Sequence, residues 1–380
     1  MKFSCNTSDF LQGLHTVSRA IGGAQALPIL GNVLLEVENG KCTLSATDLE
    51  VSIITQFPAN IESEGRITIP AKAMMNFVQY NSDTEVTMEL KDGSQLHCSS
   101  KRAKAVLSGE SANEYPNIAD IERQTVFQLK AEPLSRALHL VTFASAKTSL
   151  RPVLSGVSIR SLEGKLILVA TDSYRLSEYK LPAEGVGELS CIVPAKILEE
   201  VKVILSGAKA EKSASKEIEA KEVMVDIALS RQQIEFTIGS TRLLSRLIEG
   251  KFPDYNQIIP KETTTKVVFT LKELMTSVRR MHYFAKEMNN KLTFNCKPEE
   301  TTIATPQTQI GKDETTLACE LTGEENKIAL SSSYLLDLLG HVDGEVLLMK
   351  MVDSQHPALF YLPDEEQFLH LVMPLRMTES

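Results

Sequence analysis

Apolar and polar residues follow two recurring patterns along the chain. Pairs of apolar residues four positions apart, such as Phe10 with Leu14 and Leu274 with Val278, indicate amphipathic helices. Other stretches alternate on either side of Asn39-Gly40 and Asp92-Gly93, which predicts β-hairpins over 33–46 and 86–98 because both turn residues tolerate positive φ. The pattern therefore predicts an α+β fold, with helices packed on antiparallel sheets rather than a doubly wound parallel sheet.

The chain repeats itself, and three separate blocks recur at one spacing. The paired blocks lie 124 positions apart without a gap: Pro28–Val33 with Pro152–Val157, Ala46-Thr47-Asp48 with Ala170-Thr171-Asp172, and Ile69–Lys72 with Val193–Lys196. Agreement of three blocks at one spacing indicates an internal duplication rather than chance.

A fourth anchor shows where the second copy is longer. Glu114–Asn117 matches Lys251–Asp254 at a spacing of 137, so the second copy carries 13 extra residues. We assign them to the polar, charged stretch 207–222, which predicts a solvated loop or a short exposed helix. A fainter third copy begins near Leu271 with the same helical spacing, which gives repeats of 1–124, 125–264 and 265–380.

Each repeat follows one order: a helix, strands around tight turns, a second helix after the Pro-Ala-Lys block, and more strands. Pro70 and Pro194 begin the second helices of the first two repeats. We predict that they occupy the first helical turn, where a missing N–H costs nothing.

Composition limits the class of protein. A chain of 380 residues that is 43% hydrophobic can form two or three domains. No stretch reaches the ~18 apolar residues of a membrane span, and the first residues lack the apolar core of a secretion signal, so we expect a cytoplasmic protein without membrane contact. The six cysteines are far apart, which predicts reduced thiols rather than a zinc site or disulfides. The net charge of −9 restricts any contact with nucleic acid to local basic patches.

The sequence lacks the motifs of common catalytic sites. It has no phosphate-binding Gly-x-x-x-x-Gly-Lys loop, no Gly-x-Gly-x-x-Gly turn, no His-Glu-x-x-His and no Gly-x-Ser-x-Gly. The seven histidines are scattered, and the acidic clusters read as solvated charge. We therefore expect no catalytic residue, no metal site and no cofactor, although a hydrolase built on dispersed carboxylates stays an alternative.

Four segments, in order along all three repeats, resemble signature blocks of a known family: Leu27–Asn32, Ala170–Leu176, Glu249–Tyr255 and Val372–Met377. The chain resembles the beta subunit of bacterial DNA polymerase III, the family of sliding clamps. The resemblance implies three domains of the DNA-clamp fold and a ring of two chains joined head to tail, with helices lining the hole. It further implies a dimer interface at Val106 and Leu107 in the first repeat and at Tyr283 and Phe284 in the third.

The family's function implies two kinds of contact. A clamp tethers proteins to double-stranded DNA by encircling it, so phosphate contacts without base readout suffice. Basic residues on the predicted helices are the candidates to face DNA: Arg19, Lys72, Arg136, Lys147, Lys196, Lys202, Lys272, Arg279, Arg280 and Lys286.

The second contact is with partner proteins, namely the replicative polymerase, the clamp loader and other DNA-processing proteins. In the family they place a short peptide with a glutamine and apolar anchors between the second and third domains. By resemblance, the pocket comprises Leu154, Thr171, Tyr174, Arg175, Leu176, Pro253, Ile258, Tyr334, Met373, Pro374, Leu375 and Arg376. The apolar run 370–377 near the chain end supports this assignment, because such a run needs cover. A repeat scaffold that binds proteins without encircling DNA is the main alternative.

Overall fold

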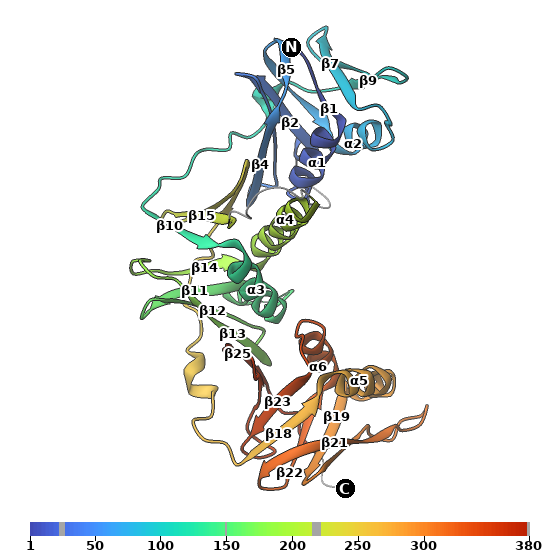
Figure 1. The fold of residues 1–380 in the computed structure, drawn as a ribbon. Helices are drawn as coiled ribbons and strands as arrows, with labels where there is room; N and C mark the ends of the chain where they lie inside the picture. Colours follow the sequence, from blue (N-terminus) through green and yellow to red (C-terminus); the bar gives the residue numbers. More distant parts are fainter. Residues whose placement is uncertain (23–26, 149, 215–221, 378–380) are drawn as a thin grey trace. The chain divides into compact units, whose positions relative to one another are not determined.

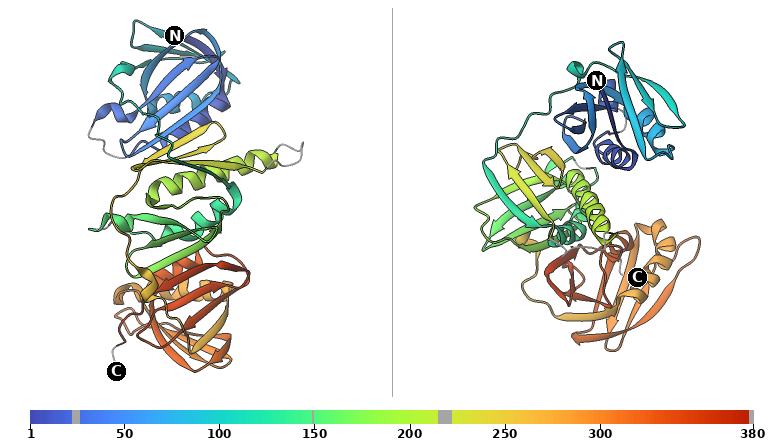
Figure 2. Two further views of the ribbon diagram at one scale, coloured as in Figure 1. Left: turned by 90° about the vertical axis from the view of Figure 1, so that its left-hand side faces the viewer. Right: turned by 45° about the horizontal axis from the view of Figure 1, so that its top comes forward.

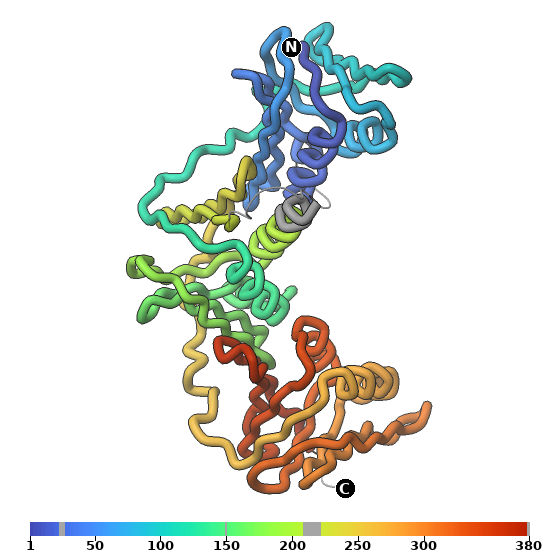
Figure 3. Tube along the Cα trace, viewed as in Figure 1, coloured from blue at the N-terminus to red at the C-terminus, as the bar shows by residue number. Residues whose placement is uncertain are grey.

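The computed structural model describes residues 1–22, 27–148, 150–214 and 222–377, with side chains described only to Gly207 in the third range. The chain forms two compact units, Met1–Glu132 with Lys196–Leu247, and Pro133–Ala195 with Ile248–Ser380. We call them the first and second units and describe each by itself. The middle of the sequence contributes to both, because the chain leaves the first unit, returns to it and leaves again (Figure 3).

The described residues contain two α-helices in each predicted repeat (Figure 1). Their bounds are α1 Thr7–Ser18, α2 Ala71–Gln79, α3 Ala131–Val141, α4 Ala195–Ala214, α5 Leu271–Ala285 and α6 Ser332–Leu339. Asn6 caps α1 by accepting a hydrogen bond from the Ser8 N–H at 2.9 Å. The predicted polar stretch 207–222 continues α4 as far as Ala214, and 215–221 lie outside the described residues.

The prediction for the two prolines was wrong by one position. Pro70 is the N-cap of α2, with φ −51° and ψ 116°, and Pro194 is the last residue of a strand. Both prolines pair in a β-ladder, Pro70 with Asn32 and Pro194 with Gly156. The strand therefore runs through the proline, and the helix begins at the following alanine.

The first unit contains two antiparallel sheets (Figure 1). A five-stranded sheet has the order β5-β1-β7-β8-β9, with β1 Lys2–Asn6, β5 Asn60–Ser63, β7 Glu85–Lys91, β8 Gln95–Ser99 and β9 Lys104–Ser108. An eight-stranded sheet has the order β10-β15-β16-β17-β4-β3-β2-β6, with β2 Asn32–Glu38, β3 Lys41–Thr47, β4 Val51–Pro58, β6 Gly65–Pro70, β10 Thr125–Lys130, β15 Met224–Leu229, β16 Gln233–Ile238 and β17 Thr241–Arg246.

The second unit contains one sheet of twelve strands, ordered β14-β11-β12-β13-β25-β24-β23-β18-β21-β20-β19-β22. Its strands from the middle repeat are β11 Gly156–Leu162, β12 Lys165–Thr171, β13 Arg175–Pro182 and β14 Ser190–Pro194. Those from the third repeat are β18 Thr265–Thr270, β19 Lys291–Lys297, β20 Glu300–Ala304, β21 Glu314–Gly323, β22 Asn326–Ser331, β23 Val346–Met351, β24 Ala358–Leu362 and β25 Glu365–Val372.

Backbone pairing joins neighbouring repeats in both units. In the first unit β4 pairs antiparallel with β17, and in the second unit β13 pairs antiparallel with β25. The strands of the middle repeat are thereby divided between two sheets. The α+β class with antiparallel sheets is confirmed, and so are the two hairpins, whose turn residues Asn39, Gly40, Asp92 and Gly93 all have positive φ.

Helices cover the sheets with their apolar faces. In the first unit α1 packs against α2 and β4, and buries Phe10, Leu14 and Val17. In the second unit α5 packs against α6 and lies over β18, β19 and β23 (Figures 1 and 2). All six cysteines are free, and burial raises the pKa of the Cys5 thiol to about 12. None of the helices in the described residues is long and apolar enough to cross a membrane.

Candidate functional site

A tight turn after β12 organises the site in the second unit. Oδ1 of Asp172 accepts hydrogen bonds from the backbone N–H groups of Tyr174 (2.9 Å) and Arg175 (3.0 Å). The Thr171 hydroxyl accepts from the Ser173 N–H at 3.1 Å and donates to the Arg175 carbonyl oxygen at 2.6 Å. Ser173 takes a φ of 82°, a left-handed conformation that short polar residues adopt more readily than bulky ones. These local bonds fix where β13 begins.

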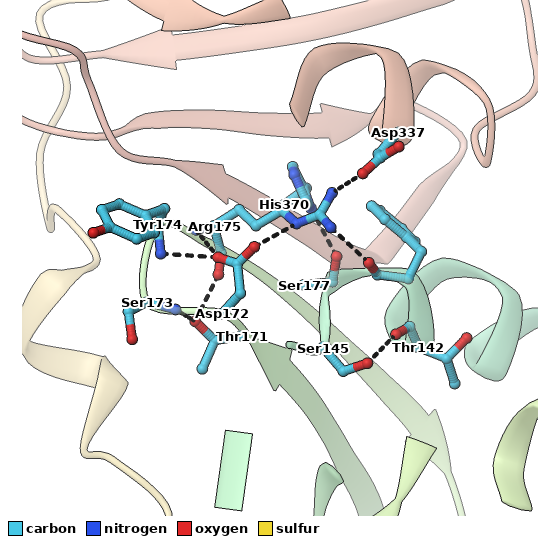
Figure 4. A network of polar contacts seen from close by, with 11 residues as sticks. Thr142, Ser145, Thr171, Asp172, Ser173, Tyr174, Arg175, Ser177, Asp337 and His370 are labelled. Carbon is cyan, nitrogen blue, oxygen red and sulfur yellow. Dashed lines mark hydrogen bonds and ion pairs between the residues drawn. The ribbon is translucent and has the colours of Figure 1, made fainter. Parts of the chain in front are cut away.

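The first residue of β13, Arg175, is buried, with an exposed fraction of 5%, and its guanidinium has partners on several sides (Figure 4). Nε donates to Asp172 Oδ2 at 3.1 Å, and Nη1 donates to Asp337 Oδ2 at 2.6 Å. Nη2 donates to the Phe143 carbonyl oxygen at 2.9 Å, and Cζ lies 4.9 Å from the centre of the Tyr334 ring. Asp337 and Tyr334 come from α6 of the third repeat, so this network joins the second and third repeats.

A buried histidine lies beside this network. Nδ1 of His370 is 2.7 Å from the Ser177 hydroxyl, and Nε2 has no hydrogen-bond partner among the described residues. Phe143 stacks between His370, with ring centres 5.3 Å apart, and His341, with ring centres 4.3 Å apart. Burial, then the nearby positive charge of Arg175, and then His341 lower the pKa of His370 to about 3. The imidazole is therefore neutral at physiological pH.

A cavity of about 170 Å³ opens between the turn, β25 and the segment that leads out of the middle repeat. Its floor is the apolar cluster of Leu176, Leu371, Tyr255 and neighbouring side chains. Seven of the predicted pocket residues line it: Leu154, Thr171, Arg175, Leu176, Pro253, Ile258 and Met373. The sequence did not single out five other lining residues, namely Arg151, Ser173, Asp254, Tyr255 and Leu371.

A polar cluster of Tyr255, Glu178 and Arg160 supports the cavity wall. The Tyr255 hydroxyl donates to Glu178 Oε2 at 2.6 Å and accepts from Arg160 Nη2 at 2.9 Å. Glu178 is buried, and the loss of water is compensated by the hydrogen bond from Tyr255 and by Lys180, whose Nζ lies 3.4 Å from Glu178 Oε1. Burial and the neighbouring Glu178 carboxylate raise the pKa of Tyr255, which keeps the phenol protonated. This cluster fixes the chain segment that carries Pro253 and Ile258.

The remaining predicted pocket residues lie outside the cavity lining. Tyr174 is 62% exposed on the turn, and Tyr334 stacks on Arg175. Leu375 donates its N–H to the Ala329 carbonyl oxygen at 2.8 Å, and the Arg376 carbonyl oxygen accepts from Lys291 Nζ at 2.9 Å. Pro374 is half-buried.

The apolar run near the chain end needs less external cover than its sequence suggested. His370, Leu371 and Val372 are buried as part of β25, and Met373 donates its N–H to the Tyr174 carbonyl oxygen at 2.8 Å. The partly exposed apolar side chains of the run are Met373, Pro374, Leu375 and Met377, and of these Met373 lines the cavity.

The residues predicted for a dimer interface lie on exposed parts of their own units. Val106 and Leu107 belong to β9, the edge strand of the five-stranded sheet, and Val106 is 53% exposed. Tyr283 is 68% exposed near the end of α5 and packs edge-on against Phe284, with ring centres 5.5 Å apart. Exposed apolar side chains on an unpaired strand edge favour pairing with another chain.

The predicted basic residues divide into two groups. Five form ion pairs: Arg19 with Glu200, Arg136 with Glu365 and Asp343, Lys196 with Asp48, Lys202 with Glu199, and Arg280 with Asp313. Five are exposed and pair with no described carboxylate: Lys72, Lys147, Lys272, Arg279 and Lys286. Arg136 is held by two carboxylates at 2.6 and 2.7 Å, so its charge is already compensated within the second unit.

Metal chemistry finds no support in the side-chain arrangement of the described residues. No three His, Cys, Asp or Glu side chains among them gather closely enough to hold an ion.

Comparison with known proteins gives the same family over the whole length. The N-terminal, central and C-terminal domain models of the DNA polymerase III beta subunit match residues 1–119, 128–254 and 256–376. Beta sliding clamps of Synechocystis and Bacillus subtilis are 28% and 26% identical, over 99% of this chain and 100% of theirs.

Solved structures agree with the sequence comparison. The Bacillus subtilis DNA polymerase sliding clamp matches with a TM-score of 0.90 at 25% identity over 100% of both chains. The Bartonella birtlesii sliding clamp bound to griselimycin matches with a TM-score of 0.91 at 27% identity, over 99% of this chain and 100% of that one. Three domain matches in order, full-length relatives and the same fold show that the chain belongs to the DNA polymerase III beta subunit family of sliding clamps.

Proposed function

We propose that this chain is a replicative sliding clamp, a non-catalytic processivity factor that encircles duplex DNA and tethers DNA polymerase III and other DNA-processing proteins. The observation that carries the proposal is the match of all three clamp domains along the complete chain. We take the clamp domains as 1–124, 125–264 and 265–380, following the internal repeat. Its place of action would be the cytoplasm, where bacterial DNA is replicated.

The strand pairing within each unit supports a ring of two chains. One antiparallel junction joins β4 to β17, and a second joins β13 to β25. By the repeat, β21 is the counterpart of β4 and β13, and β9 is the counterpart of β17 and β25. The outer edge of β9 pairs with no described strand. In β21 the second half pairs with β18, whereas the first half, residues 314–318, pairs with β20 alone among the described strands. A third junction of the same kind would therefore pair β9 of one copy with the first half of β21 of another, and head-to-tail contacts of this type close when the rotation divides the circle.

Uncompensated basic residues on or next to the helices are the proposed contacts to DNA. Of the ten candidates, we retain Lys72, Lys147, Lys272, Arg279 and Lys286 as the main ones, because they are exposed and pair with no described carboxylate. Phosphate contacts from such side chains attract duplex DNA without selecting a sequence, which permits sliding. We assign Arg136 to the junction between the second and third repeats, since Glu365 and Asp343 already hold its charge.

The cavity beside Arg175 is the proposed docking site for partner peptides. Its floor is apolar, while Thr171 and Ser173 supply polar groups at the rim. An apolar cavity with few fixed polar groups suits one or two anchor side chains, and a flexible methionine at the rim adapts to several partners. The partners would be the polymerase, the clamp loader and other proteins that carry a peptide with a glutamine and apolar anchors.

Topological retention tests the proposed function. When the complete chain is loaded onto a nicked circular plasmid by a bacterial clamp loader, it should stay with the plasmid during gel filtration in high salt. A single cut in the plasmid should release it, because a ring slides off an end while salt weakens only the ionic contacts. Loss from the intact circle in high salt would support the non-encircling scaffold instead.

Paired variants connect this test to the interface. Val106→Glu combined with Tyr283→Glu should give monomers in analytical ultracentrifugation and no retention on circles, because charge is placed on an apolar contact. Leu162→Glu changes an apolar residue, 50% exposed, that lies on neither β9 nor α5, and should stay dimeric. Dimers from the double variant would show that the interface lies elsewhere.

A charge at the cavity mouth should block peptide docking. Met373→Glu is expected to weaken binding of a labelled peptide with one glutamine and two leucines about 30-fold, as loss of one anchor contact costs about 2 kcal/mol. Fluorescence anisotropy measures the affinity. Leu162→Glu, on an apolar residue 50% exposed in the same unit, is the matched control and should bind like the parent protein. Equal affinities in Met373→Glu and the control would refute the site.

A further inference from the structure

The turn that organises the peptide site occurs a second time, in the first unit. Oδ1 of Asp48 accepts from the N–H groups of Glu50 (3.0 Å) and Val51 (2.8 Å). The Thr47 hydroxyl accepts from the Leu49 N–H at 3.0 Å and donates to the Val51 carbonyl oxygen at 3.0 Å. Leu49 has a φ of 77°, against 82° for its counterpart in the second unit. The same four hydrogen bonds therefore form the turn in both units.

The strand beside the turn is also copied. Val51 pairs with Ser245 in the first unit as Arg175 pairs with Val372 in the second. Arg246 donates its N–H to the Glu50 carbonyl oxygen at 3.2 Å, the same bond that Met373 makes to Tyr174. Arg246 thus occupies in the first unit the position that Met373 occupies in the second.

A cavity of about 690 Å³ lies at this copied position. Thr47, Leu49 and Pro116 line it, as their counterparts Thr171, Ser173 and Pro253 line the peptide cavity. The other walls have changed chemistry: Ser52 stands in place of Leu176, and Arg246 stands in place of Met373. The duplication has preserved the turn and the strand pairing, while the cavity beside them is larger and its lining is polar instead of apolar. We call this cavity the first-junction pocket.

Two arginines line the first-junction pocket without an ion pair to any described carboxylate. Arg231 and Arg246 are exposed and form no ion pair within the described residues. Two nearby arginines of the same unit differ, since Arg123 and Arg242 are both held on Glu235, at 2.9 and 2.5 Å. A guanidinium has a planar array of donors that matches a carboxylate, so Arg231 and Arg246 are available to an acidic ligand.

Leu49 adds an apolar contact to the same pocket. It is 53% exposed and has positive φ, a conformation that glycine adopts without strain and that is unfavourable for a bulky side chain. Its counterpart Ser173 takes the same conformation with a smaller, polar side chain. An exposed leucine held in a strained backbone conformation at the rim of a cavity is suited to contact a ligand.

We propose that the first-junction pocket binds a peptide segment in which an Asp or Glu lies next to an apolar side chain. The carboxylate contacts Arg231 and Arg246, and the apolar side chain packs on Leu49. Three carboxylates also line the pocket, namely Glu50, Glu122 and Asp120, of which Asp120 is held by Arg242 at 2.7 Å. They repel a continuous polyanion, which favours a peptide with a single carboxylate over nucleic acid. The proposal deepens the proposed function, since the segment belongs to a clamp partner that uses this pocket as a second anchor beside the peptide site.

The test begins with a selection on the complete protein. A random heptapeptide library is displayed on phage and selected against the Met373→Glu variant, in which the peptide site is blocked. Enriched peptides should carry Asp or Glu beside Leu, Ile or Phe. Synthetic versions are then measured by fluorescence anisotropy against the parent protein and its variants.

Three variants separate the two contacts. Arg231→Glu with Arg246→Glu should weaken the selected peptides at least about tenfold, because a charge-assisted contact is replaced by repulsion, and the parent affinity should fall as salt rises. Leu49→Gly should also weaken them while melting no earlier than the parent, since it removes the contact and relieves the positive φ. Arg66→Glu, on an exposed arginine of the same unit outside the pocket, should leave the affinity for the selected peptides unchanged.

Several results would overturn the proposal. These are enrichment of peptides without a carboxylate, no enrichment at all, equal affinity in the double arginine variant, or competition by a single-stranded oligonucleotide that equally depends on the two arginines. Binding of the glutamine-containing peptide to the parent protein is measured in parallel. Loss of binding of the glutamine-containing peptide would count against the proposed function. If that peptide still binds and any of the four contrary results is obtained, only the first-junction pocket is refuted.

Discussion

Replacing Arg175 by alanine should destabilise the second unit by about 3 kcal/mol, because removal of one partner from a buried ionic network leaves the others without compensation. The guanidinium is 5% exposed and satisfies Asp172, Asp337 and a backbone carbonyl oxygen. Asp337 is 45% exposed and can regain water, which places the estimate at the lower end of the usual range of about 3–5 kcal/mol. Calorimetry should show an unfolding transition lowered by roughly 5–10 °C.

Two controls define the cause of that loss. Arg175→Lys keeps the charge but loses the planar array of donors, so it should fall between alanine and the parent. Arg66→Ala removes an exposed arginine whose carboxylate partner is 3.9 Å away, and should change stability by less than about 0.5 kcal/mol. Hydrogen exchange of the paired β13 and β25 amides should accelerate in Arg175→Ala. Unchanged protection there would show that the network contributes little to the junction.

Acid should weaken the second unit through His370. Its folded-state pKa is lowered to about 3, while a histidine in an unfolded chain titrates near 6.5. Between these two pKa values the imidazole of His370 is protonated in the unfolded chain and neutral in the folded chain. Stability from this residue is thus complete above about pH 6.5 and declines as pH falls toward 3, by up to about 1.4 kcal/mol per pH unit.

Denaturant titrations at several pH values measure this slope. His370→Asn keeps a hydrogen-bonding group beside Ser177 but cannot titrate, so its stability should depend less on pH between 6.5 and 4, although it starts lower. Ser177→Ala retains the imidazole and removes only the 2.7 Å contact, so it should keep the pH dependence. If His370→Asn and the parent protein share one slope, other groups cause the acid sensitivity.

Sequence reasoning recovered the repeated elements because they depend on local pattern. Helical spacing at Phe10 and Leu14, and the turn pairs Asn39-Gly40 and Asp92-Gly93, are decided by neighbours in the chain, and the structure has α1 and two hairpins there. The duplicated Ala-Thr-Asp blocks likewise correspond to the same turn in both units. The two prolines were misplaced by one residue because pattern alone does not show that a strand continues through them.

The lining of the candidate cavity was predicted in part, because the family's blocks supplied some of its residues. Leu154, Leu176 and Met373 were carried over from the family's blocks and do line the cavity. Tyr255 and Leu371 were missed because aromatic and aliphatic residues within such runs are indistinguishable from core positions until the sheet is built. The bond from Arg175 to Asp337 spans 162 positions, and no local pattern indicates such a pair. The sequence repeat alone did not indicate the first-junction pocket, because that pocket depends on the pairing of β17 with β4.

The two sheets that join neighbouring repeats have a consequence for how the chain can be divided. The boundaries of the repeats do not coincide with the boundaries of the sheets. The middle repeat contributes β10 and β15–β17 to one sheet and β11–β14 to another. A gene fragment cut at the repeat boundaries would separate β17 from β4 and β13 from β25. The isolated middle repeat would then expose the edges of β13 and β17, which form the two sides of one kind of strand junction. Copies of such a fragment can pair with one another without limit. Because pairing continues across the repeats, a single repeat cannot be exchanged without exposing strand edges that are paired within the full-length chain.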